Sequence, residues 1–327
     1  MWVWLEKLLG QTPPVPPVLD NDPTPIVIPP PPLPPMTTLE VLSSPGHGKT
    51  SFLWGLMFMV RQLSRAWPQY DAQSRDLGME NAIESLRQAM VNRELPREGA
   101  GDRSYHLLLR QMERWKDQPL LIKDDRDPVF GGGNGAAPGR HEVNWGVPVC
   151  WLLSLSDLGK DGAQLFDVEL NKLVHARRNS GWSFETQPLQ LIIALTKADR
   201  IPNLPHGLRR YLKDDPLATE VKAESELLAH GVKPGNPAFR FDDRAVQSGE
   251  SYLNHLWEAH RQIADWLGST LAGSLLARRA GAQHIDLRFC LVSATGSDLR
   301  SDGHLEAHWR PYRVLDPLFW ALELANR

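Results

Sequence analysis

The chain contains the stretch Ser43-Ser44-Pro45-Gly46-His47-Gly48-Lys49-Thr50. An extended run at 37–42 precedes it, and a helical pattern begins near Lys49. A strand, a glycine-rich turn, a Lys-Thr pair and a helix, in this order, are the context of a phosphate-binding loop. Successive backbone N–H groups and a helix N-terminus form a positive concavity in which an anion settles. We therefore predict that phosphate binds here.

The positions of this loop have separate expected roles. Gly46 and Gly48 allow unusual φ angles and a close approach of the ligand. Lys49 would reach the β- and γ-phosphates, and the Thr50 hydroxyl would ligate Mg²⁺. The remaining expected phosphate contacts are Ser44, Pro45, His47 and Ser51. The usual pattern begins with glycine and this one begins with serine, but an ordinary turn with a solvated lysine would not explain the strand and helix around it.

Composition and charge limit the class of protein. The chain has 327 residues, of which 42% are hydrophobic, enough for one large domain or two small ones. Its net charge of −3 implies no general affinity for nucleic acid or an anionic membrane. Cys150 and Cys290 lie in apolar runs, so we expect buried thiols in a reducing compartment. Neither a secretory signal nor a membrane-spanning apolar run is evident, so a cytoplasmic protein is expected.

The N-terminal part differs in composition from the rest. Met1 to Gly10 is a short apolar helix candidate with Trp2 and Trp4, and residues 11–35 are dominated by proline. Proline favours polyproline II, so these later residues are predicted to form a semi-rigid spacer. We expect residues 1–35 to be a docking peptide on a linker, which engages a protein partner or the domain formed by 36–327.

Apolar runs and helical spacing alternate along the chain. Strands are predicted at 37–42, 105–109, 119–122, 147–155, 189–195 and 285–292. Helices are predicted at 49–67, 71–91 and 162–177, within a helical insertion at about 205–280, and after Asp316 as an N-cap. The alternation predicts an α/β fold, doubly wound, with a mostly parallel sheet and helices on both faces. Ligands of such sheets bind at the carboxyl ends of the strands.

The strand predicted at 189–195 ends in Thr196-Lys197-Ala198-Asp199. A carboxylate at Asp199 can accept two parallel hydrogen bonds from guanine N1–H and N2–H₂, and adenine offers no such donor pair. Here the chain resembles the Ras-like, translation-factor class of P-loop GTPases, whose guanine motif is Asn/Thr-Lys-x-Asp. The resemblance implies that Lys197 lays its stem along the base. A solvated Lys and Asp at a strand end is the alternative.

The last predicted strand ends in Val292-Ser293-Ala294-Thr295, which resembles the Ser-Ala-x motif of the same class. In that class a backbone N–H of the motif contacts the guanine oxygen. The resemblance covers roughly Thr37 to Arg327 in element order. It implies a Ras-like strand order, with GTP or GDP and Mg²⁺ as ligands.

Two further motifs of the class are altered. The class has a switch threonine before the second strand, and no threonine lies between Asp71 and Ser104. Its third strand ends in Asp-x-x-Gly, and here the best match is Asp124-Asp125-Arg126-Asp127, followed by Pro128. The resemblance implies that Asp124 holds Mg²⁺ through water, while Asp127 replaces the glycine that meets the γ-phosphate. A second match, Asp157-Leu158-Gly159-Lys160, ranks lower because its strand fits better as the fourth.

These motifs imply a guanine-nucleotide-binding switch with weak or partner-activated GTP hydrolysis, in which Lys49, Thr50 and Asp124 stabilise charge. Arg126, Arg140 or a partner's arginine are candidates for a finger. Two alternatives stay open. One is a degenerate, non-hydrolysing scaffold that senses nucleotide. The other is a P-loop ATPase of a signalling or defence complex, against which the Asp199 motif argues.

A narrower resemblance is to the bacterial double-GTPase group of multi-gene conflict (defence) systems. It is carried by Lys49-Thr50-Ser51-Phe52-Leu53, Glu94-Leu95-Pro96 and Arg313-Val314-Leu315-Asp316-Pro317-Leu318-Phe319-Trp320. This resemblance implies a protein partner, either a second GTPase or an effector, in a bacterial defence or signalling system.

Overall fold

A computed structural model of the chain describes residues 35–65, 67, 69–74, 77–95, 103–112, 114–124, 129, 143–154, 162–182, 187–201, 203–218, 249–282 and 284–326. The predicted docking peptide and residues 11–34 of the predicted proline-rich linker lie outside these residues. The strands are β1 (Thr37–Ser43), β2 (Asp71–Ser74), β3 (Arg103–Met112), β4 (Lys116–Asp124), β5 (Val149–Ser154), β6 (Leu189–Thr196) and β7 (Ile285–Leu291). The helices are α2 (Lys49–Gln62), α3 (Leu77–Val91), α4 (Gly162–Asn179), α5 (His206–Lys213), α7 (Gly249–Gly268), α8 (Leu271–Ala282) and α9 (Asp316–Ala325), with short 3₁₀ turns η1 (Leu63–Arg65) and η3 (Ala198–Arg200).

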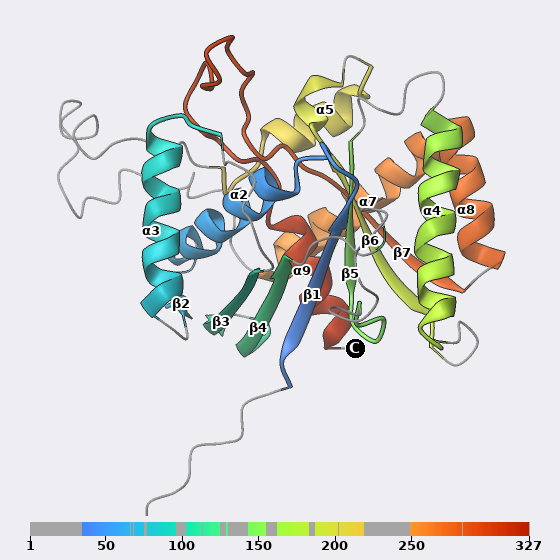
Figure 1. Ribbon diagram of the computed structural model, residues 1–327, viewed down its shortest axis with the longest axis horizontal. Helices are drawn as coiled ribbons and strands as arrows, with labels where there is room; N and C mark the ends of the chain where they lie inside the picture. The colour runs from blue at the N-terminus through green and yellow to red at the C-terminus, as the bar shows by residue number, and fades with distance from the viewer. Residues whose placement is uncertain are drawn as a thin grey trace, which may run out of the picture. The chain divides into compact units, whose positions relative to one another are not determined.

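The strands form one seven-stranded sheet in the order β2-β3-β4-β1-β5-β6-β7 (Figure 1). Five neighbouring strands, from β4 to β7, run parallel, and β2 and β3 extend the sheet as an antiparallel edge. The predicted α/β class with a mostly parallel sheet is therefore confirmed. All the parallel strands end at the same edge, so the loops that follow β1, β6 and β7 share that edge.

The central strands are buried on both faces, which explains their continuous apolar sequences. Every residue of β1 and β5 is buried. Glu40 of β1 is buried although it is charged, and its carboxylate accepts a hydrogen bond from Lys123 Nζ at 2.7 Å. Glu40 and Lys123 are direct neighbours in the register of β1 and β4. The ion pair thus compensates a carboxylate that would be costly to bury alone.

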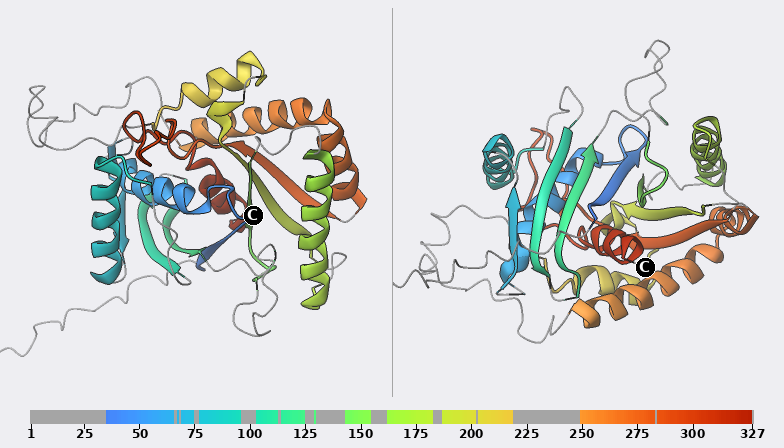
Figure 2. Two further views of the ribbon diagram at one scale, coloured as in Figure 1. Left: turned by 45° about the horizontal axis from the view of Figure 1, so that its top comes forward. Right: turned by 90° about the horizontal axis from the view of Figure 1, so that it is seen from below.

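Helices cover both faces of the sheet (Figure 2). Successive residues of β5 alternate between two apolar clusters, Cys150 and Leu152 on one face and Trp151 and Leu153 on the other. The first cluster includes side chains of α2, α3 and α9, and the second includes side chains of α4, α5 and α8. Helix α7 contributes to both. The prediction of two buried, unpaired cysteines is also confirmed.

One predicted helix is divided differently in the structure. Residues 71–91 were expected to be a single polar helix, but Asp71–Ser74 is strand β2 and the helix α3 starts at Leu77. The sequence Asp-Ala-Gln-Ser has low strand propensity, and its residues alternate between exposed and half-buried. Backbone pairing with β3 creates this edge strand, so local sequence gives little sign of it.

Asp316 does not cap helix α9 as predicted. Leu315 is the N-cap residue, no side chain bonds the helix end there, and Asp316 is the first helical residue. The fully buried carboxylate of Asp316 instead accepts hydrogen bonds from Tyr211 Oη at 2.7 Å and Tyr252 Oη at 2.6 Å. The residue therefore joins α5, α7 and α9, and its long-range partners compete with the local cap.

Three helices, α5, α7 and α8, lie in the range of the predicted insertion at about 205–280, of which 219–248 is outside the described residues. Within the described part of the chain, none of the helices combines the length and the apolar character needed to span a membrane.

Candidate functional site

Residues 43–50, here called the phosphate loop, join β1 to α2. Gly46 and Gly48 have φ of +82° and +84°, and a Cβ built on either would meet open space. Their left-handed backbone, not crowding, is therefore what requires glycine. The N–H of His47 donates to the carbonyl of Ser44 at 3.2 Å, which closes the turn.

Helix α2 presents its N-terminus to this loop. No side chain caps the helix, and its first turn holds no acidic residue. Lys49, Thr50 and Ser51 are half-buried in that first turn, and Pro45 and Gly46 are exposed. A helix N-terminus with no side-chain cap and no acidic residue in its first turn is suited to an anion such as phosphate. The residues present thus fit the predicted ligand.

His47 anchors the phosphate loop on the sheet. Its side chain is buried, and its ring Nδ1 lies 3.3 Å from the carbonyl oxygen of Leu152 in β5. The carbonyl of His47 accepts a hydrogen bond from the Thr196 hydroxyl at 2.9 Å. Because Thr196 is the last residue of β6, this bond connects the phosphate loop to the motif predicted to bind the base.

Glu169 of α4 is a contact of the phosphate loop that the sequence did not reveal. Its carboxylate is buried and accepts a hydrogen bond from the hydroxyl of Ser44. Glu169 Oε2 has no hydrogen-bond partner among the described residues. Ser44 and Glu169 are far apart in the chain, and no local sequence pattern indicates that a glutamate on this helix contacts Ser44.

Residues 196–200, here called the β6 loop, contain the predicted base motif. Lys197 has a left-handed φ of +53° and is half-buried, and Asp199 is exposed in the short turn η3. The N–H of Ala198 donates to the carbonyl of Val292 at 3.1 Å, at the end of β7. An exposed carboxylate in this position is accessible to a ligand at the sheet edge.

Residues 293–298, here called the β7 loop, lie against helix α2 and residues 310–312. Ser293 and Tyr312 exchange two backbone hydrogen bonds, at 3.1 and 2.8 Å, and the carbonyl of Thr295 accepts one from Arg310 at 2.9 Å. A Cβ on Gly55 of α2 would lie 3.4 Å from the carbonyl oxygen of Ala294. These contacts fix the backbone of the predicted contact residues Ser293, Ala294 and Thr295.

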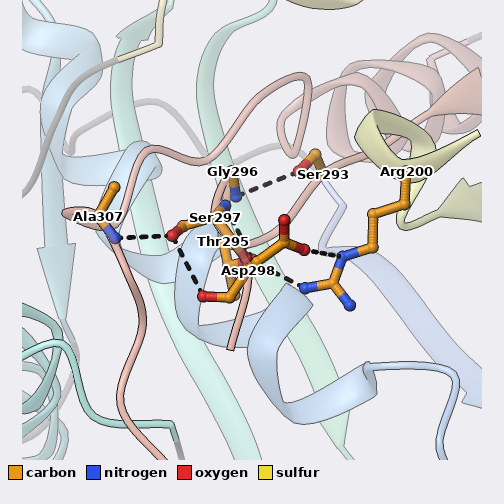
Figure 3. A network of polar contacts seen from close by, with 7 residues as sticks. All are labelled: Arg200, Ser293, Thr295, Gly296, Ser297, Asp298 and Ala307. Atoms are coloured by element: carbon orange, nitrogen blue, oxygen red, sulfur yellow. Dashed lines mark hydrogen bonds and ion pairs between the residues drawn. The ribbon is translucent and has the colours of Figure 1, made fainter. Parts of the chain in front are cut away.

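The β6 and β7 loops are also joined by a side chain. Arg200, the residue after Asp199, places its Nε 3.2 Å from Asp298 Oδ1, and its Nη2 donates to the carbonyl of Ser297 at 3.2 Å (Figure 3). Arg200 was not among the predicted site residues, because its partners become visible only when the two loops are placed side by side.

The predicted Mg²⁺ side of the site is described only in part. Asp124 is the last residue of β4, which runs parallel to β1 beside the phosphate loop, and residues 125–128 and 157–160 lie outside the described residues. Among the residues that are described, no group of three or more His, Cys, Asp or Glu side chains is arranged to hold a metal ion. The assignment of Thr50 and Asp124 to Mg²⁺ stays a prediction.

No protein-family model matches the chain, and no curated protein sequence matches it. The functional interpretation therefore depends on the geometry of the three loops and on the chemistry of their side chains.

Proposed function

We propose that the protein is a guanine-nucleotide-binding switch with weak or partner-activated GTP hydrolysis. The phosphate loop follows β1, the β6 loop carries Thr196-Lys197-Ala198-Asp199, and the β7 loop carries Ser293-Ala294-Thr295. The strand order from β3 to β7 resembles that of Ras-like P-loop GTPases, with β2 added at the edge. Three motifs in the expected chain order, at one edge of one sheet, support the proposal.

The hydrogen bond from Thr196 Oγ1 to the His47 carbonyl, 2.9 Å long, is the observation that carries this proposal. The sugar limits how far the base of a nucleotide can lie from its phosphates, so a site for both needs two loops held within that distance. This bond provides that constraint between residues 149 apart in sequence. The buried Thr196 hydroxyl thus uses its hydrogen bond on the phosphate loop.

Each side chain has a role that follows from its chemistry. Lys49 and the N–H groups at the start of α2 bind the phosphates, and Asp199 accepts the paired N–H groups of guanine. Mg²⁺, held by Thr50 and by Asp124 through water, would neutralise charge on the phosphate oxygens. Lys197 belongs to the β6 loop and would cover the base with its stem.

A nucleotide sensor that does not hydrolyse GTP is a second candidate function, and the altered γ-phosphate motifs favour it. Asp127 and Pro128 occupy positions where the class has a glycine that meets the γ-phosphate and a residue that orients water. No threonine lies between Asp71 and Ser104 to sense the γ-phosphate. The contacts to guanine and the β-phosphate are not affected by these changes, so binding is expected to survive better than the chemical step.

The identity of the nucleotide retained through purification tests the proposal. We expect GDP or GTP in the wild-type protein and none in Lys49→Ala, because Lys49 is the side chain placed to meet the phosphates. Circular dichroism and thermal unfolding check that the variant is folded. Bound ADP or ATP, or equal retention by folded Lys49→Ala, would contradict the assignment.

The partner belongs to the same proposal and is supported by the narrower resemblance and by residues 1–10. Trp2 and Trp4 are the side chains expected to anchor this segment on a second GTPase or an effector. Deletion of residues 1–35 should leave nucleotide affinity unchanged and weaken co-purification with that protein. Unchanged assembly of the shortened chain would argue against a docking role.

A further inference from the structure

The side chain of Thr196 has a single hydrogen-bond donor. A threonine hydroxyl carries one donor hydrogen, and in this structure it is used on the carbonyl of His47 at 2.9 Å. The side chain of Thr196 therefore has no second donor with which to hold the β7 loop. Backbone bonds such as Ala198–Val292 join the strand ends, so a contact between side chains farther along the two loops would have to come from another residue.

Arg200 supplies this contact. Its guanidinium spans the two loops, with Nε 3.2 Å from Asp298 Oδ1 and Nη2 donating to the Ser297 carbonyl at 3.2 Å (Figure 3). Guanidinium nitrogens are arranged in a rigid fork, so two contacts fix direction as well as distance. Arg200 also belongs to the same short 3₁₀ turn as Asp199.

The β7 loop that Arg200 contacts is already folded upon itself. The hydroxyl of Thr295 donates to the Ser297 carbonyl at 3.0 Å, and the hydroxyl of Ser297 accepts from the N–H of Ala307 at 2.8 Å. The N–H of Gly296 donates to the Ser293 hydroxyl at 3.2 Å. Ser297 is thus connected to Thr295 by a hydrogen bond, and Gly296 to Ser293 by another.

We propose that Arg200 is a positioning residue that sets the distance between the Asp199 carboxylate and the backbone N–H groups of residues 294 and 295, since the N–H of Ser293 already donates to the Tyr312 carbonyl. This inference rests on the proposed function. Asp199 would bind the N1 and N2 edge of guanine, and the β7 loop would bind its 6-oxo group. Arg200 therefore acts on the discrimination of 6-oxopurines through the loop and does not itself contact the nucleotide.

If Arg200 served only to stabilise the fold, its loss would lower thermal stability. The side chains of Arg200 and Asp298 are 42% and 69% exposed, and ion pairs this exposed contribute little to folding. The Ala198–Val292 backbone bond holds the strand ends together without Arg200, at 3.1 Å. Loss of Arg200 should therefore change ligand binding while leaving thermal stability almost unchanged.

The test measures GDP affinity and dissociation rate with the full chain. We expect Arg200→Ala to raise the Kd for GDP about fivefold, mainly through faster dissociation, because an exposed contact of this kind contributes up to about 1 kcal/mol. Asp298→Ala keeps the Ser297 contact and should raise Kd about threefold by the same mechanism. The matched control is Arg300→Ala, which removes the pair between Arg300 and Asp302, 3.7 Å apart within one segment, and should bind GDP as the wild type does.

Two further measurements separate positioning from a general loss of binding. Arg200→Asp combined with Asp298→Arg should recover part of the affinity that either change alone removes. The preference for GDP over 6-thio-GDP, whose sulfur is a weaker acceptor, should fall in Arg200→Ala, because the loop no longer presents its N–H groups to the 6-position.

The outcomes distinguish this inference from the proposed function. Wild-type protein that binds GDP, together with folded Arg200→Ala that binds it equally well and with the same 6-thio-GDP preference, would overturn the role of Arg200 alone. Wild-type protein that binds no guanine nucleotide would overturn the proposed function and this inference together.

Discussion

Two side chains fix the phosphate loop, and both come from distant parts of the sequence. Thr196 donates to the carbonyl of His47 from the end of β6, and Glu169 accepts from the hydroxyl of Ser44 from helix α4. Each contact involves a buried or half-buried group, so each limits how the loop can move. A loop held before the ligand arrives loses less conformational freedom on binding, which favours affinity.

The first prediction concerns the hydroxyl of Thr196. Thr196→Ala should raise the Kd for GDP about fivefold, because a typical intramolecular hydrogen bond contributes roughly 1 kcal/mol. Thr196→Ser keeps the hydroxyl and is the matched control, with affinity close to that of the wild type. Titration calorimetry with GDP provides the measurement. Equal affinities for the alanine and serine variants would show that the bond to His47 does not organise the site.

The sequence predicts the residues that carry local motifs and misses those defined by distant partners. Gly46, Gly48 and Lys49 form a pattern within a few positions, so their roles can be proposed without coordinates. Glu169 and Arg200 have no such pattern, because a glutamate on a helix and an arginine in a turn are common on any surface. Only the pairing of β1 with β5 and of β6 with β7 brings their partners near.

Helices α5, α7 and α9 are joined by one buried carboxylate. Asp316 accepts hydrogen bonds from Tyr211 of α5 and Tyr252 of α7, and burial raises the pKa of its carboxyl to about 6. The guanidinium of Arg313 lies over the ring of Tyr211, 3.7 Å from its centroid. Helix α5 is the next helix after the β6 loop in the chain. This buried network therefore fixes the helix that follows the candidate site.

The second prediction tests this network by removing one oxygen atom, the hydroxyl of Tyr252. Tyr252→Phe should lower the free energy of unfolding by about 1–3 kcal/mol, because it leaves a buried carboxylate oxygen without its donor. Tyr70→Phe is the matched control, since the buried hydroxyl of Tyr70 has no hydrogen-bond partner among the described residues. Urea unfolding of both variants gives the comparison. A loss as large in Tyr70→Phe would assign the effect to packing and not to the Asp316 network.

The third prediction concerns pH. Burial, with Arg288 nearby, lowers the pKa of His260 to about 4, and its Nδ1 accepts a hydrogen bond from the Phe289 N–H at 3.1 Å. Between about pH 6.5 and 4 the unfolded chain binds a proton at this histidine and the folded chain does not, so the histidine's contribution to stability is lost as pH falls through this range. Asp316 acts in the opposite sense, because its raised pKa makes the folded state bind a proton first between about pH 6 and 4.

His260→Asn separates the two effects, because asparagine keeps an acceptor near the Nδ1 position and does not titrate. The stability of this variant relative to the wild type should increase as the pH is lowered from 7 to 4.5. His255→Asn, at an exposed position on the same helix, is the control and should follow the wild type. A constant difference between His260→Asn and wild type at all pH values would contradict the assignment.

The prediction of elements succeeded where burial dictates the pattern and failed where pairing does. Strands β5 and β6 are almost continuously apolar because helices cover both faces, so their sequences identify them. Strand β2 and the role of Asp316 depend on partners across the fold. Neither the polar sequence at 71–74 nor an aspartate before a proline indicates which residues will be those partners.

The whole molecule gathers its three motif loops at one edge because β1, β6 and β7 are parallel members of one sheet. Two apolar clusters, one on each face, fix the strands, and the hydrogen bonds of Thr196 and Arg200 fix the loops to one another. Under the proposed function, binding of base and phosphate would depend on the assembled sheet. The sequence differs from the GTPase class in the residues expected to contact the γ-phosphate.

The fourth prediction follows from those altered contacts. GDP and GTP should bind with similar affinity, and the isolated protein should hydrolyse GTP very slowly, since Asp127 and Pro128 replace residues that act on the γ-phosphate and the water. A ligand shifts a conformational equilibrium only by its differential affinity, so strong switching would require a partner. Single-turnover hydrolysis is the measurement. A rate near or above about one per second, the range of partner-stimulated GTPases, would refute slow intrinsic turnover.

Competition between GDP and ADP for the purified full-length protein decides whether these loops bind guanine. We expect wild type to favour GDP by about 2–4 kcal/mol, or roughly 30-fold to 1000-fold, because an unmatched buried polar group costs that order. Asp199→Asn should lose this preference and gain affinity for xanthosine diphosphate, since an amide offers a donor where guanine needs an acceptor. Equal binding of ADP and GDP by the wild-type protein would contradict the guanine assignment.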